Sequence, residues 1–146
     1  MFKHVLLPTD GSQVARKAIK AGVALAKELG AKVTAYYALD TVPYIYSNGH
    51  VISTAMLKDY EKRARERGAE YLADVEKAAK MAGIPCETLV TSPATPAQGI
   101  VAAAKRQKCD VIFMASHGRS ELGSLLLGSV TQKVLAQTKV PVLVYR

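Results

Sequence analysis

A loop rich in glycine and hydroxyl residues is the part of this 146-residue chain whose residue types and spacing best suggest chemistry. It runs from Ala115 to Thr131, and Gly118 and Gly128 lie near its two ends. Glycine lets backbone N–H groups approach an anion without a Cβ in the way, and unpaired N–H groups at a helix start carry partial positive charge. Ser129 and Thr131 add hydroxyl donors. These features together predict a loop that binds phosphate.

The same residues also fit a purely structural role. Gly128 and Ser129 could simply cap the last helix, because serine is a preferred N-cap residue. Gly123 and Gly128 have the spacing of a Walker loop, but Ser129 stands where the phosphate-binding lysine belongs, which disfavours a P-loop hydrolase. There is no G-x-G-x-x-G after the first apolar run, and Leu122 breaks the G-x-S-x-G esterase pattern. From these residues alone, phosphate binding and helix capping both remain open.

A second candidate is Asp10, in the segment Pro8-Thr9-Asp10-Gly11-Ser12 that follows the first apolar run. Its carboxylate could accept hydrogen bonds from ribose hydroxyls or hold a divalent cation through water, or it could cap the following helix. No direct metal ligand is predicted, since His4, His50 and His117 have no partner at metal-binding spacing. His117 could donate to a phosphate or pack within its loop.

The elements that must position these residues follow from hydrophobic patterning. The predicted strands are Val5–Leu7, Lys32–Asp40, Glu87–Val90, Asp110–Met114 and Pro141–Tyr145. The predicted helices carry apolar stripes over Ala15–Ala26, Ala64–Ala82, Ala97–Ala104 and Val130–Gln137. The long connection from Thr41 to about Met56 is predicted to be a mobile flap, because connections of that length are usually functional or disordered.

Alternating strands and helices predict an α/β fold with right-handed crossovers, in which a five-stranded parallel sheet lies between two layers of helices. We expect a three-layer αβα sandwich with strand order 3-2-1-4-5. The first strand is then central, and its end at Asp10 lies beside the end of the fourth strand at Ala115. Ligands of such sheets bind where the strand order reverses, so the two candidate loops are expected to meet.

Composition limits the alternatives. With 49% hydrophobic and 22% charged residues, the chain is predicted to form one domain over residues 1–146. The net charge of +8 is spread along helices beside acidic residues, which predicts neither a nucleic-acid nor a membrane partner. No apolar stretch is long enough to span a bilayer, so the predicted location is cytoplasmic. Cys86 and Cys109 are predicted to be reduced, structural thiols.

Over its whole length the chain resembles the universal stress protein family, with its UspA-like domain. The nucleotide-binding branch of that family has the signature G-x-x-G, nine residues, then G-[S/T]. The matching segment here is Ala115-Ser116-His117-Gly118, nine residues, then Gly128-Ser129, so only the first glycine is replaced. The opening Pro8–Ser12 and the closing Pro141–Val144 also resemble the family's first and last strands.

This resemblance implies a Rossmann-like fold of the adenine nucleotide alpha hydrolase-like type, and a set of site residues. Asp10 would contact the ribose, the backbone of Ala38 would meet adenine, and Pro8 would line the base pocket. The remaining residues of the implied nucleotide site are Thr9, Met114, Ala115, His117, Gly118, Gly128, Ser129, Val130 and Thr131. The family's pairing of last strands implies a homodimer edge at Val142, Leu143, Val144 and Tyr145.

The implied function is a nucleotide-dependent stress-response or signalling module that binds ATP or AMP, with Mg²⁺ held through water near Asp10. Two alternatives remain. One is a nucleotide-free dimeric interaction protein, which the methyl group of Ala115 favours. The other is a slow ATP hydrolase, for which the loop supplies neither a second carboxylate nor a lysine; the sequence therefore favours a binding protein over an enzyme.

Overall fold

The chain folds around one five-stranded parallel sheet in a computed structural model that describes residues 1–40, 53–118 and 126–146. The strands are β1 (His4–Pro8), β2 (Lys32–Ala38), β3 (Cys86–Thr91), β4 (Val111–Ala115) and β5 (Val142–Tyr145). Their order in the sheet is β3-β2-β1-β4-β5, and every neighbouring pair is parallel. The predicted fold class and strand order are confirmed.

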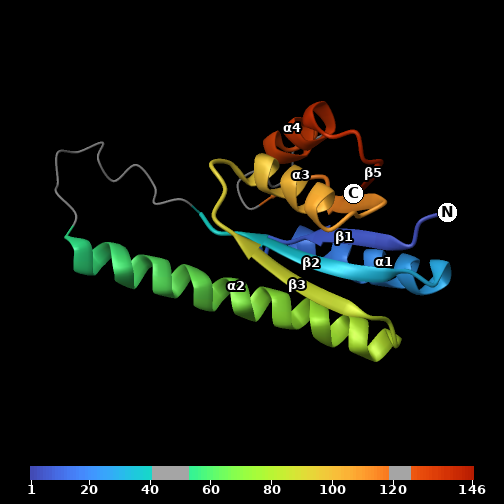
Figure 1. Cartoon of the computed structure of the whole chain (residues 1–146), viewed down its shortest axis with the longest axis horizontal. Coiled ribbons are helices and arrows are strands. Elements are labelled where there is room, and N and C mark those ends of the chain that lie inside the picture. Colours follow the sequence, from blue (N-terminus) through green and yellow to red (C-terminus); the bar gives the residue numbers. More distant parts are fainter. Residues whose placement is uncertain (41–52, 119–125) are drawn as a thin grey trace.

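Four described helices cover the two faces of this sheet. They are α1 (Gln13–Leu29), α2 (Thr54–Ala82), α3 (Pro96–Arg106) and α4 (Ser129–Gln137). One hydrophobic core lies between the sheet and α1 and α2, and a second lies between the sheet and α3 and α4. Figure 1 shows α2 along one side of the sheet and α3 and α4 along the other, which gives the predicted three layers. None of the helices in the described part of the chain is both long and apolar enough to cross a membrane.

The continuous apolar runs reflect burial on both faces. Within β1, Val5 and Leu7 belong to the core beneath α1 and α2, whereas Leu6 belongs to the core beneath α3 and α4. Phe113 and Ile112 of β4 divide between the two cores in the same way. A strand covered on both faces needs apolar side chains at every position, so it shows no polar alternation.

The long predicted loop ends earlier than expected. The prediction that it continues to Met56 is wrong, because Ser53 caps α2 by accepting a hydrogen bond from the Met56 N–H at 3.2 Å. Residues 41–52, which hold most of the predicted flap, lie outside the described residues. The first turns of α2 extend past the end of the sheet (Figure 1) and carry an exposed ion pair of Asp59 with Arg63 at 3.0 Å. They contact no core, so the apolar stripe that predicted this helix could not reveal its start.

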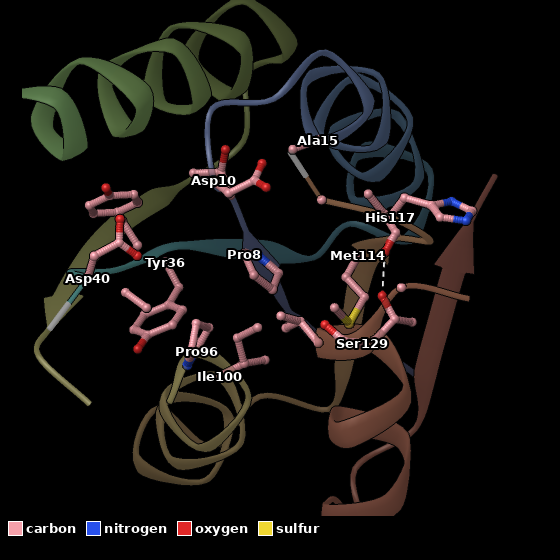
Figure 2. Close-up of a pocket in the computed structure, with 18 residues that line it drawn as sticks. Pro8, Asp10, Ala15, Tyr36, Asp40, Pro96, Ile100, Met114, His117 and Ser129 are labelled. Atoms are coloured by element: carbon pink, nitrogen blue, oxygen red, sulfur yellow. Dashed lines mark hydrogen bonds between the residues drawn. The ribbon is translucent and has the colours of Figure 1, made fainter. Parts of the chain in front are cut away.

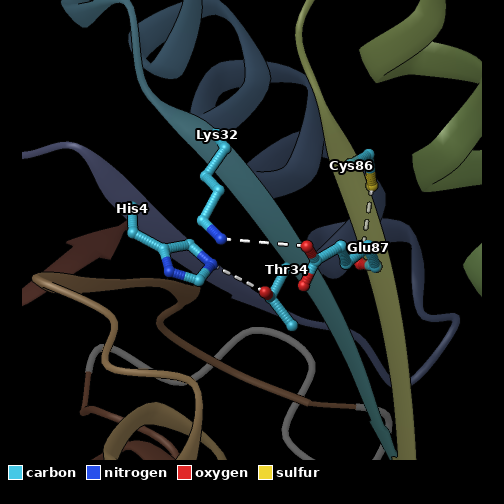
Figure 3. A network of polar contacts seen from close by, with 5 residues as sticks. All are labelled: His4, Lys32, Thr34, Cys86 and Glu87. Atoms are coloured by element: carbon cyan, nitrogen blue, oxygen red, sulfur yellow. Dashed lines mark hydrogen bonds and ion pairs between the residues drawn. The ribbon is translucent and has the colours of Figure 1, made fainter.

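A buried polar pair lies at the amino ends of the strands, at the opposite end of the sheet from Asp10. The His4 imidazole, 5% exposed, shares a hydrogen bond of 2.7 Å with the hydroxyl of Thr34 (Figure 3). Lys32 forms an ion pair with Glu87 at 3.8 Å beside them. Burial lowers the pKa of His4, and the charge of Lys32 lowers it further, against the opposing effects of Glu87 and Asp110.

Lowering the pH is therefore expected to destabilise the fold through His4. The unfolded chain keeps a histidine pKa near about 6.5 and binds the proton more readily than the folded state, so the free energy of unfolding falls as the pH drops below that value. Urea unfolding in buffers spanning that pH would measure the slope. His4→Gln, which keeps a hydrogen-bonding side chain beside Thr34, should reduce it. Equal slopes in both proteins would contradict this origin.

Both cysteines are free. Cys109 is buried and Cys86 is half-buried, and burial raises the pKa of Cys109 to about 11. A thiol with so high a pKa stays protonated near neutral pH and is a poor nucleophile. The prediction of reduced, structural thiols agrees with this arrangement.

Candidate functional site

A cavity of about 280 Å³ lies at the carboxyl ends of β1, β2 and β4, beside the starts of α3 and α4 (Figure 2). It lies where the strand order reverses, since β1 pairs with β2 on one side and with β4 on the other. Every residue of the nucleotide site predicted from the sequence lines this cavity. Those residues are Pro8, Thr9, Asp10, Ala38, Met114, Ala115, His117, Gly118, Gly128, Ser129, Val130 and Thr131. Their contacts with a ligand stay predictions.

The cavity has further walls that the sequence did not reveal. These lining residues are Ala15, Tyr36, Tyr37, Asp40, Pro96 and Ile100. Tyr36 and Tyr37 lie within β2, where their pattern cannot be distinguished from that of core residues. Pro96 follows the N-cap Thr95 of α3, and a proline in the first turn is a recognisable sign of a helix start at this edge of the sheet.

The loop after β1 presents Asp10 to the cavity. Ser12, not Asp10, caps α1, since its hydroxyl accepts the Ala15 N–H at 3.1 Å. The Asp10 carboxylate accepts the Ser12 N–H at 2.9 Å, and Figure 2 shows the side chain at the cavity's edge. A Cβ added to Gly118 would lie 3.0 Å from Asp10 Oδ2, so the absence of a side chain there lets the two loops approach closely. The alternative that Asp10 is the helix cap is therefore wrong.

The start of α4 forms another wall. Gly128 is the N-cap, with no side-chain capping hydrogen bond. The alternative that Gly128 and Ser129 cap the helix is therefore correct for Gly128 and wrong for Ser129, which is the first residue of α4. The Gly128 N–H donates to Ser116 O at 2.7 Å, which ties the helix start to the end of β4. The first hydrogen bond within the helix runs from the Gln132 N–H to Gly128 O, at 3.0 Å. The N–H groups of the three helical residues before Gln132 therefore have no acceptor within the helix. A helix start of this kind suits an anion.

Two predicted phosphate donors have other partners. The Thr131 hydroxyl, on a side chain 2% exposed, donates to Ala115 O at 3.0 Å and Ser116 O at 3.3 Å. The His117 ring shares hydrogen bonds with the Ser116 hydroxyl at 2.7 Å and with Leu126 O, and in Figure 2 it points away from the cavity. The loop-packing role of His117 is the one that the structure shows. Thr131 holds α4 against β4, so only its backbone N–H remains suited to phosphate.

Ala115 fits its strand without strain. It pairs with Tyr145 of β5, and Lys108 is the only residue other than glycine with a positive φ among those described. A methyl group at a position with negative φ carries no conformational penalty. The replacement of the motif's first glycine is thus compatible with this backbone.

The charge of the cavity wall is mainly carboxylate. Asp10 and Asp40 line it, and no lysine or arginine does among the described residues. Within residues 1–40, 53–118 and 126–146, no group of three or more His, Cys, Asp or Glu side chains could hold a metal. An anionic ligand would therefore depend on backbone N–H groups for binding. A cation bound through water at Asp10 is the other group that could offset its charge.

Replacing Thr131 with valine is expected to lower the free energy of unfolding by about 1–3 kcal/mol, because the Ala115 carbonyl loses the hydroxyl donor and the Ser116 carbonyl keeps the Gly128 N–H but loses its second donor. Nucleotide affinity should fall with it, since α4 loses the Thr131 hydrogen bonds to the end of β4 and keeps the Gly128 N–H bond to Ser116 O. Thr131→Ser keeps the hydroxyl and serves as the control in urea unfolding. A Thr131→Val protein as stable as the wild type would show that these hydrogen bonds contribute little.

The sheet order, the crossover helices and the cavity at the reversal point define a Rossmann-like α/β protein with a cavity at the carboxyl ends of its strands, where ligands of such sheets bind. The chain belongs to the universal stress protein family, whose model matches residues 1–146. It is 36% identical to the universal stress protein in the QAH/OAS sulfhydrylase 3′ region of Thermus aquaticus, with all of both chains covered. It is 33% identical to universal stress protein MJ0531 of Methanocaldococcus jannaschii, covering 100% of this chain and 83% of that one.

Solved structures share the fold. The hypothetical protein MJ0577 of Methanocaldococcus jannaschii superimposes with a TM-score of 0.85 at 26% identity, covering 99% of this chain and 95% of that one. A universal stress protein in complex with cAMP has a TM-score of 0.73 at 24% identity, covering 99% and 97%. The universal stress protein of Archaeoglobus fulgidus in complex with dAMP has a TM-score of 0.61 at 16% identity, covering 100% and 98%.

Proposed function

We propose that this universal stress protein binds an adenine nucleotide, AMP or ATP, and acts as a nucleotide-dependent stress-response or signalling module. The observation that carries the proposal is the cavity itself, because Asp10 and the first turn of α4 both line it. A carboxylate suits ribose hydroxyls, and a helix start whose N-cap is a glycine without a side-chain capping hydrogen bond suits phosphate. Two proteins of the same fold have been solved in complex with an adenine mononucleotide, one with cAMP and the other with dAMP.

The proposed roles follow the cavity walls. Asp10 accepts hydrogen bonds from the ribose, and Pro8, Ala38 and Met114 surround the base. Backbone N–H groups of the first turn of α4 hold the phosphates, with the hydroxyl of Ser129 as an additional donor. Tyr36, Pro96 and Ile100 add an apolar surface that a purine ring would cover. A magnesium ion would join this site only through water at Asp10.

The same proposal includes one domain over residues 1–146, a cytoplasmic location, and no nucleic-acid or membrane partner. It also includes a homodimer through β5, an edge strand of the sheet whose Leu143 is 38% exposed. An exposed apolar edge strand is a ready template for another strand. Size-exclusion chromatography with light scattering tests the dimer, and Leu143→Lys should shift it to monomer.

Binding and turnover measurements distinguish this proposal from two rival functions, a nucleotide-free interaction protein and a slow ATP hydrolase. The nucleotide-free interaction protein loses support because Ala115 is accommodated by its backbone. For the slow ATP hydrolase, the described cavity wall offers Asp10 and Asp40 but no lysine to assist. Measurable ATP turnover that Asp10→Asn removes would favour the hydrolase.

The proposed function is tested by isothermal titration of the purified protein with ATP, AMP and GTP, with and without magnesium. Denaturing extraction beforehand identifies any nucleotide already bound. Adenine-selective binding at micromolar affinity or tighter is expected. Absence of binding together with absence of a carried-over nucleotide would refute the proposal and favour a nucleotide-free interaction protein.

A further inference from the structure

The loop that carries Asp10 depends on an unusual backbone conformation. Gly11 has φ of +75°, in the left-handed region, and its N–H donates to the Thr9 hydroxyl at 3.1 Å. This conformation reverses the chain between Asp10 and Ser12, whose N–H donates to the Asp10 carboxylate at 2.9 Å. The direction of the carboxylate is thus set by the backbone at Gly11.

A tyrosine from a distant helix lies directly on that glycine. A Cβ added to Gly11 would lie 2.2 Å from Cζ of Tyr71 and 2.3 Å from its Cε1, so the ring of Tyr71 fills the space where a side chain would be. Tyr71 belongs to α2 and is half-buried. It is absent from the cavity wall, so its contact is with the loop's outer side.

A second aromatic ring holds Tyr71 in place. The rings of Tyr71 and Tyr37 pack edge to face, with centroids 5.8 Å apart and planes at 68°. Tyr37 lines the cavity from β2 and is 2% exposed. An edge-to-face pair of this geometry is favourable and orients both rings. Tyr71 therefore has a fixed partner on the sheet side and Gly11 on the loop side.

We propose that Tyr71 is a positioning residue for the ribose end of the cavity, an inference that rests on the proposed function. Its ring holds Gly11 in the left-handed conformation and so keeps the Asp10 carboxylate directed at the ribose hydroxyls. Tyr71 acts through Asp10 and does not touch the nucleotide. The position of α2 consequently sets how much the ribose contributes to affinity.

The test compares AMP with 2′,3′-dideoxyadenosine monophosphate, which lacks the ribose hydroxyls. By isothermal titration, the wild type is expected to bind AMP at least about tenfold more tightly than the dideoxy nucleotide, the value of one or two hydrogen bonds to a carboxylate. Tyr71→Ala should reduce this ratio toward about one while changing the affinity for the dideoxy nucleotide by less than about threefold, as expected when only those bonds are lost. Tyr71→Phe keeps the ring over Gly11 and should keep a ratio well above that of Tyr71→Ala, and Asp10→Ala should remove the ratio.

Circular dichroism and thermal melts show whether each variant is folded. If Tyr71→Ala unfolds, Tyr71→Leu retains apolar bulk against Tyr37 but not a flat ring over Gly11, and it should lower the ratio as well. An unchanged ratio in the folded variant, equal weakening of both nucleotides, or a Phe variant that behaves like Ala would overturn the inference and leave the proposed function standing. A wild type that binds neither nucleotide would overturn both.

Discussion

Replacing Gly128 with valine is expected to abolish nucleotide binding and leave the fold intact. Gly128 has φ −61° and ψ 154°, an extended conformation that valine adopts readily, so the substitution introduces no backbone strain. The residue is buried and lines the cavity where α4 begins. The added methyl groups therefore occupy the space that the phosphates need beside the first-turn N–H groups.

Losing two hydrogen bonds to a charged phosphate corresponds to an affinity reduced by about 100-fold or more. Isothermal titration with AMP measures this loss, and thermal melts verify that the protein is folded. Ser129→Ala is the matched control next in the chain, and the loss of its single hydroxyl should weaken binding between about twofold and tenfold. Equal AMP affinity in the wild type and the folded Gly128→Val variant would refute the proposed phosphate site.

Replacing Gly68 with alanine is expected to lower the free energy of unfolding by about 2 kcal/mol, although alanine is the better helix former. A Cβ at this position would lie 2.4 Å from Cδ1 and 2.6 Å from Cε1 of Tyr37. Tyr37 is 2% exposed and packs on Tyr71, so its ring has little space into which to move. Overpacking between α2 and β2 then outweighs the gain in helix propensity.

Urea unfolding of Gly68→Ala measures this effect, and Ala69→Gly is the matched control. Ala69 is exposed on the same helix, so its replacement by glycine should cost about 1 kcal/mol through propensity alone. Both substitutions are then destabilising although they are chemically opposite. A Gly68→Ala protein more stable than the wild type would mean that Tyr37 relaxes freely away from α2.

The edges of elements were the least predictable part of the fold. The start of α2 at Thr54 is stabilised by the Ser53 cap and exposed ion pairs rather than by an apolar face, so hydrophobic periodicity could not locate it. The predicted second strand extended to Asp40, whereas β2 ends at Ala38. Leu39 donates its N–H to Thr91 O at 2.8 Å, which continues the chain beside β3 without extending the ladder.

The fold class and the meeting of the two candidate loops could be read from the residues. Continuous apolar runs that alternate with amphipathic segments require a parallel sheet covered on both faces, and such a sheet brings the end of β1 beside the end of β4. The spacing from Ala115 to Gly128-Ser129 marked the second loop and the family. These features depend on local residue patterns and on the order of the elements along the chain, so the sequence is enough to predict them.

Individual side-chain roles depended on tertiary contacts. The Thr131 hydroxyl and the His117 ring are chemically suited to donate to phosphate, yet each forms hydrogen bonds with the loop or strand around it. Tyr71 gave no sign in the sequence beyond an apolar stripe, and its place over Gly11 arises only when α2 packs on the sheet. Sequence patterns record burial and backbone preference, whereas the partner of a hydrogen-bonding group or ring is chosen by which distant segments the fold brings into contact.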